Sequence, residues 1–83
     1  MTAPRITAAM VSTVAEAPAA VVVLDEAAGA VRLQPTLTTQ QAQDPALVVL
    51  LDHYGARYWM RARGTAGAAA AAATAEARLA VAA

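Results

Sequence analysis

The sequence contains no cysteine and no lysine, one serine (Ser12) and one histidine (His53). Without cysteine the chain has no disulfide, no thiolate metal ligand and no cysteine nucleophile. Zinc sites take three or four His, Cys or carboxylate ligands, which one histidine and scattered acids do not supply. Asp52 precedes His53 directly, and neighbouring side chains point away from each other on a helix or a strand. We therefore expect no catalytic residues, metal site, cofactor or small-molecule substrate, and a solvated surface position for His53.

Bulky apolar side chains are also scarce. Phenylalanine is absent, Tyr54, Tyr58 and Trp59 are the three aromatic residues, and alanine makes up close to a third of the chain. A buried alanine contributes little more than one methyl group, about 0.8 kcal/mol, while ordering each residue costs roughly 1–2 kcal/mol of backbone entropy. We therefore expect marginal stability for the isolated chain, and a protein partner or a homo-oligomer that supports it.

The chain has neither a charge excess nor a long hydrophobic run. Six arginines balance six acids, so the net charge gives no general attraction to nucleic acid or to an anionic membrane. The alanine run 68–73 is too short and too weakly apolar to span a bilayer, and the polar residues of the first 17 positions make a poor signal peptide. These features predict a cytoplasmic protein without a membrane partner.

A length of 83 residues predicts one small domain. We expect the α+β class, with a small α+β domain over residues 1–66 and an alanine-rich helical tail or docking helix over residues 67–83. The clearest pattern is a β-hairpin at about 20–34, where a β-branched run and an alternating strand flank a turn that ends at Gly29. In this hairpin Leu24 pairs with Val31 and Val22 pairs with Leu33.

The segments on either side of the hairpin predict short helices. In residues 3–17, apolar side chains at positions 6, 10, 14 and 17 form one stripe of a helix, with Thr2 as its cap and Pro4 in its first turn. Several β-branched residues leave a strand open as an alternative there. Residues 36–43 predict a polar connection with one helical turn, which Thr38 and Gln41 open as a capping box.

Residues 44–64 allow two interpretations. As one helix, Asp44 is the N-cap, Pro45 takes the first position and Gly64 ends the helix. As a second β-hairpin at about 46–62, residues 52–55 form the turn and Gly55 takes the left-handed conformation. The helix is favoured because cap, proline and terminal glycine agree with its length, and its apolar stripe then includes Tyr54 and Tyr58.

The segment 57–63 is the candidate interaction surface. It combines arginine with aromatic side chains, the residue types that are enriched at protein–protein hot spots and that also bind single-stranded nucleic acid. The favoured interpretation is nevertheless structural, with the aromatics in the core and arginine stems lying over apolar surface. The candidate interaction residues are Tyr54, Arg57, Tyr58, Trp59, Arg61 and Arg63.

From these features we expect a non-catalytic structural or protein-interaction component. It self-associates or belongs to a larger assembly, such as a virion, or serves as an accessory protein. The alternative is a small nucleic-acid-binding or regulatory module that uses the segment 57–63. Because the net charge is zero, nucleic acid is the less favoured partner.

Overall fold

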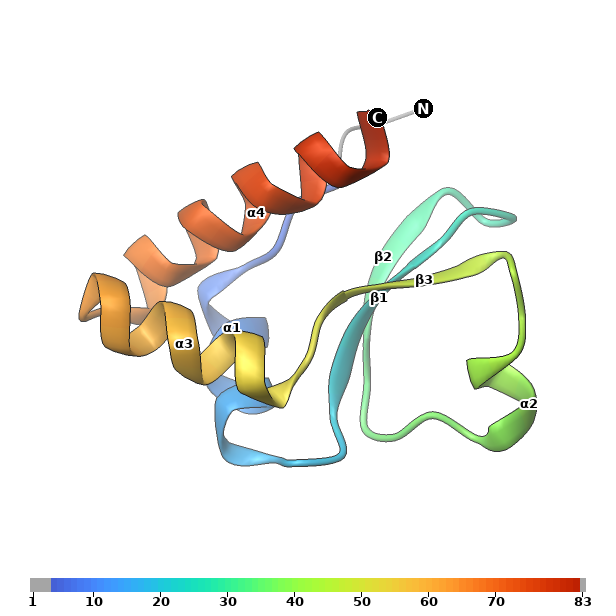
Figure 1. The fold of residues 1–83 in the computed structure, drawn as a ribbon, viewed down its shortest axis with the longest axis horizontal. Helices are drawn as coiled ribbons and strands as arrows, with labels where there is room; N and C mark the ends of the chain where they lie inside the picture. The colour runs from blue at the N-terminus through green and yellow to red at the C-terminus, as the bar shows by residue number, and fades with distance from the viewer. Residues whose placement is uncertain (1–3, 83) are drawn as a thin grey trace.

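The computed structural model describes residues 4–82, apart from the side chain of Ala82. It confirms the α+β class: a three-stranded antiparallel sheet packs beside a group of three helices (Figure 1). The elements are α1 (Ala8–Glu16), β1 (Val21–Asp25), β2 (Ala30–Gln34), α2 (Thr39–Ala42), β3 (Leu47–Leu51), α3 (His53–Arg63) and α4 (Ala66–Ala82).

The predicted hairpin is present in the predicted register. Strands β1 and β2 pair antiparallel, with Val22 opposite Leu33 and Leu24 opposite Val31. Gly29 adopts a φ of 67°, a conformation that residues with a Cβ rarely take. The Asp25 carboxylate accepts hydrogen bonds from the backbone N–H groups of residues 27 and 28, which fixes the turn. The connection to β3 contains the predicted capping box between Thr38 and Gln41 at the start of α2.

Neither interpretation of residues 44–64 is correct as a whole, because the segment forms a strand followed by a helix. Residues 47–51 form β3, which pairs with the central strand β1. Asp52 then accepts a hydrogen bond from the Gly55 N–H at 2.7 Å and caps α3. The single helix is wrong because Val48 and Val49 complete the sheet, and the second hairpin is wrong because Asp52 starts a helix.

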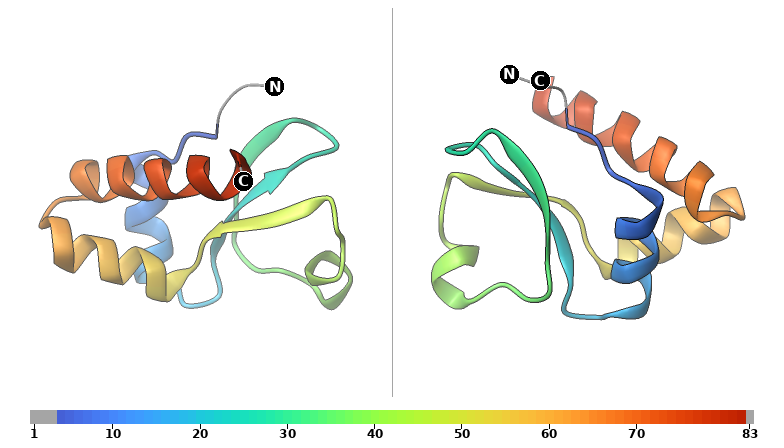
Figure 2. Two further views of the ribbon diagram at one scale, coloured as in Figure 1. Left: turned by 45° about the horizontal axis from the view of Figure 1, so that its top comes forward. Right: turned by 180° about the vertical axis from the view of Figure 1, so that it is seen from behind.

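The first helix is shorter than predicted. Helix α1 begins at Ala8, and Thr7 is its N-cap, with the Thr7 hydroxyl accepting a hydrogen bond from the Met10 N–H. Residues 4–7 run alongside α4 instead (Figure 2, right), and the predicted cap Thr2 lies outside the described residues. Ile6 is buried outside the helix because its backbone hydrogen-bonds to Thr74 of α4.

Helices α1, α3 and α4 pack against one another and form most of the core (Figure 2, left). Helix α4 is docked through one stripe of small side chains, and Ala69, Ala73 and Ala77 are all buried. Small side chains allow the helices to approach closely. The alanines therefore contribute to the core through tight helix–helix packing and not through large side chains. The division into residues 1–66 and 67–83 stays a prediction.

We expect two glycines at the α3–α4 junction to respond oppositely to alanine. Gly64 ends α3 with a φ of 84°, whereas Gly67 lies inside α4, where an added Cβ meets no atom within 4 Å. Gly64→Ala should destabilise the protein by about 1 kcal/mol, and Gly67→Ala should stabilise it by roughly 0.5–1 kcal/mol. Urea denaturation measures both changes, and equal signs would contradict the junction geometry.

Candidate interaction surface on helix α3

Helix α3 has one buried side and one exposed side. Ala56 is fully buried, and Met60, one turn further along, packs partly buried against the core. Residues four apart lie on the same helix face, so this pair sets the inward face. The positions roughly opposite, near residues 54, 58 and 61, must therefore face outward.

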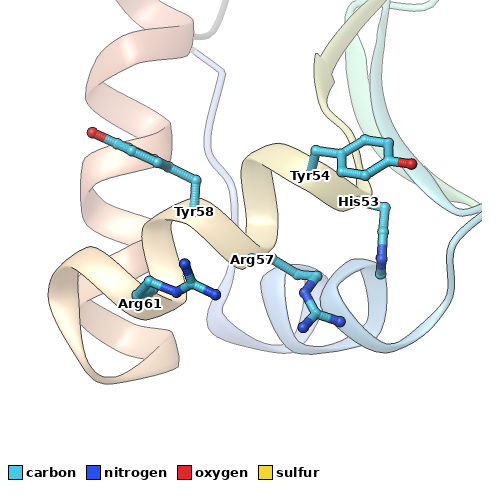
Figure 3. Close-up of a pocket in the computed structure, with 5 residues that line it drawn as sticks. All are labelled: His53, Tyr54, Arg57, Tyr58 and Arg61. Atoms are coloured by element: carbon cyan, nitrogen blue, oxygen red, sulfur yellow. The ribbon is translucent and has the colours of Figure 1, made fainter.

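The exposed side carries four of the six candidate residues, which we call the α3 surface: Tyr54, Arg57, Tyr58 and Arg61. The tyrosines are 81% and 63% exposed, and both arginines are exposed. With His53 they line a shallow, open hollow of about 410 Å³. Figure 3 shows the two tyrosines along one edge of this surface and the arginines along the other. The expectation that the tyrosines belong to the core is wrong.

The α3 surface is positively charged, and no acidic side chain of the described residues forms a salt bridge with its arginines. The salt bridge found among the described residues joins Arg32 and Asp25 on the hairpin, at 3.3 Å. Arg57 and Arg61 therefore have no ion-pair partner within residues 4–82. Two guanidinium groups one turn apart, each with five N–H donors, remain available to carboxylates of another molecule.

The structure separates Trp59 and Arg63 from the α3 surface. Trp59 is partly buried against the core, as the structural interpretation predicted for the aromatics. The Arg63 guanidinium lies 5.3 Å from the centre of the Trp59 ring, a cation–π distance. The Tyr58 and Trp59 rings also pack in a T-shaped arrangement, with 5.0 Å between ring centres and 77° between ring planes. Trp59 thus packs against the ring of Tyr58. The six candidate residues do not form one face.

His53 is not the solvated surface residue that the sequence predicted. It is half-buried at the start of α3, and its Nδ1 lies 2.9 Å from the Val14 carbonyl oxygen at the end of α1. This hydrogen bond joins α1 and α3 and provides a partner for a carbonyl in the last turn of α1. The observed contacts of His53 are therefore structural.

A second hollow, which the sequence did not predict, lies at the other end of the sheet. It has a volume of about 240 Å³ and is lined by Glu26, Val48, Ala80 and Val81. Its lining comes from the hairpin turn, from β3 and from the last turns of α4, segments that are far apart in the sequence. No local pattern marks such a site, which exists only because α4 docks beside β3.

Within the described residues, no three or more His, Cys, Asp or Glu side chains group closely enough to hold a metal ion, and no helix has the length and apolarity needed to cross a bilayer. Comparisons of the chain with protein-family models, with curated proteins and with solved structures found no match.

Proposed function

We propose that the protein is a non-catalytic protein-interaction component of an assembly, and that the α3 surface is its contact site. The observation that carries the proposal is the exposure of both tyrosines, 81% for Tyr54 and 63% for Tyr58. The absence of cysteine agrees with the reducing cytoplasm as its compartment.

The cost of this exposure supports the proposal. Fully burying a large apolar side chain stabilises a fold by roughly 1.5–3 kcal/mol. The chain has three aromatic residues, and its core is otherwise built from valine, alanine and few larger residues. The fold has few large apolar side chains, and it gains little stability as a monomer from two aromatic rings that lie mostly in solvent. Tyrosine and arginine are the residue types that dominate binding energy at protein interfaces.

Nucleic acid is the alternative partner and fits the geometry less well. Binding of single strands relies on base stacking along a positively charged groove. Trp59, the largest stacking surface, is partly buried, and Arg63 lies against its ring. The α3 surface itself has two arginines, on a chain of zero net charge, whereas non-specific binding rests mainly on several phosphate contacts.

Site-specific photo-crosslinking in the native cell tests the proposed contact site. A photoreactive amino acid at position 58 should form a discrete crosslink to protein, while the same group at the exposed position Ala71 on α4 should not. Once the crosslinked protein is identified, Tyr54→Ala and Tyr58→Ala should each weaken its binding about tenfold or more, as hot-spot truncations do. Isothermal titration calorimetry measures the loss.

Two results would contradict the proposal. Equal crosslinking from positions 58 and 71 would show that the α3 surface is not a specific contact. Quenching of Trp59 fluorescence by an oligonucleotide at low salt, reversed by added salt, would favour the nucleic-acid alternative. The circular dichroism spectra of both tyrosine variants should match the wild type because both side chains are exposed.

A further inference from the structure

We infer that the partner of the α3 surface is a second copy of this chain, which binds through the hollow formed by Glu26, Val48, Ala80 and Val81. The inference rests on the proposed function, since it names the occupant of the same contact site. Two observations carry it: the opposite charges at the two ends of the molecule, and the presence of an apolar hollow at the acidic end.

Two exposed arginines lie at one end of this neutral chain and two exposed acids lie at the other. Arg57 and Arg61 are exposed on α3, at the opposite end of the molecule from the β1–β2 turn and the start of β3 (Figure 1). At that far end lie the exposed residues Glu26 and Asp44, whose segments are joined by a hydrogen bond from the Glu26 N–H to the Ala46 carbonyl. Arg32 offsets Asp25, but no described arginine pairs with Glu26 or Asp44.

The hollow beside Glu26 suits an aromatic ring. Val48, Ala80 and Val81 supply apolar walls, and Glu26 supplies the charge at its rim. A tyrosine of the α3 surface that enters this hollow buries its ring, and an arginine one turn away reaches the acidic rim. The tyrosines of one copy thus match the hollow of the next copy, and the arginines match its carboxylates.

Such a contact joins two different surfaces, so it is heterologous. A heterologous contact leaves a free α3 surface on one copy and a free hollow on the other, and further copies add in a ring or an open filament. Both surfaces are small, so the contact buries less than the roughly 1,200 Å² of a standard interface. We expect weak, reversible association that salt reduces, because its ion pairs lie at an exposed rim.

Mixing two complementary variants tests the inference directly. In the first variant, Arg57→Glu and Arg61→Glu disable the α3 surface. In the second, Glu26→Gln and Asp44→Asn remove the charge of the acidic end, and the asparagine oxygen can keep the hydrogen bond that Asp44 accepts from the Ala46 N–H. All four positions are exposed, and circular dichroism and thermal melting of each variant serve as controls of folding.

Sedimentation equilibrium at low salt should show a wild-type mass that rises with concentration above 8.4 kDa. Each variant alone should remain a monomer. An equimolar mixture should form a dimer, because the intact α3 surface of the second variant meets the intact hollow of the first. Raising the salt concentration from about 0.05 M to about 0.5 M should increase the dissociation constant of that dimer at least several-fold.

Other outcomes overturn the inference. A wild type that stays monomeric at every concentration excludes a second copy as the partner, and the proposed function then stands or fails separately on the position-58 crosslink to a different protein. Variants that associate alone as strongly as the wild type show that other residues hold the oligomer. Variants that stay monomeric and form no dimer on mixing, while the wild type self-associates, show that the α3 surface of one copy does not bind the hollow of the next.

Discussion

Ala69→Leu should destabilise the protein by about 1–3 kcal/mol, the usual cost of forcing extra carbons into a packed core. Ala69 is fully buried on α4, in the region where α1, α3 and α4 pack together. Its methyl group sets how closely these helices approach, and a leucine adds three carbons that displace a neighbouring helix. Leucine is nearly as good a helix former as alanine, so helix propensity does not account for the loss.

The effect is large relative to the stability available. A domain of this length has roughly 5 kcal/mol of unfolding free energy, and each kcal/mol lost lowers its melting temperature by about 4–8 °C. Thermal denaturation followed by circular dichroism measures the change. Ala68→Leu is the matched control, because residue 68 is the exposed neighbour on the same helix. If both variants melt at the same temperature, the close packing of α4 is disproved.

The alanine tract illustrates what the sequence could and could not predict. Its composition predicts a helix, and the structure has one over Ala66–Ala82. Nearly uniform alanine has almost no amphipathic pattern, so the sequence does not show which side is buried. The buried stripe at residues 69, 73 and 77 is set by the approach of α1 and α3, which is tertiary information.

Residues 44–64 show why local signals were insufficient. Asp44 and Asp52 are both good N-caps, and only the second one starts a helix with an apolar inward face. Val48 and Val49 form a strand because β1 offers a partner in the sheet, a contact that spans more than twenty residues. The local propensity of a segment contains no information about a strand that pairs with it from elsewhere in the sequence.

The wrong helix boundary in residues 44–64 also led to the wrong orientation of the residues of the α3 surface. A helix that began at Pro45 would place Tyr54 and Tyr58 on one stripe with Leu47 and Leu51, and so in the core. Because α3 begins at His53 instead, Ala56 and Met60 set its inward face and the tyrosines point outward. The sequence proposed these residues as the candidate site, but their orientation depended on the element boundary.

Thr74→Val should cost about 1–3 kcal/mol, because it removes the two hydrogen bonds between Thr74 of α4 and Ile6 of the N-terminal segment. The Thr74 hydroxyl accepts a hydrogen bond from the Ile6 N–H at 2.9 Å and donates one to the Ile6 carbonyl at 3.2 Å. Ile6 is 3% exposed, so water does not readily replace either partner. Valine has the same shape and keeps the packing, which isolates the loss of the hydroxyl group.

Thr74→Ser is the control that separates hydrogen bonding from packing. It keeps the hydroxyl and removes one methyl group, so it should cost less than the valine variant. Amide hydrogen exchange provides a local readout, because the Ile6 N–H should lose its protection in the valine variant and keep it in the serine variant. If valine is tolerated and serine is not, the contact of Thr74 is apolar packing. The third hydrogen bond to this segment, from Arg78 Nε to the Pro4 carbonyl at 3.1 Å, is then the polar contact that holds it.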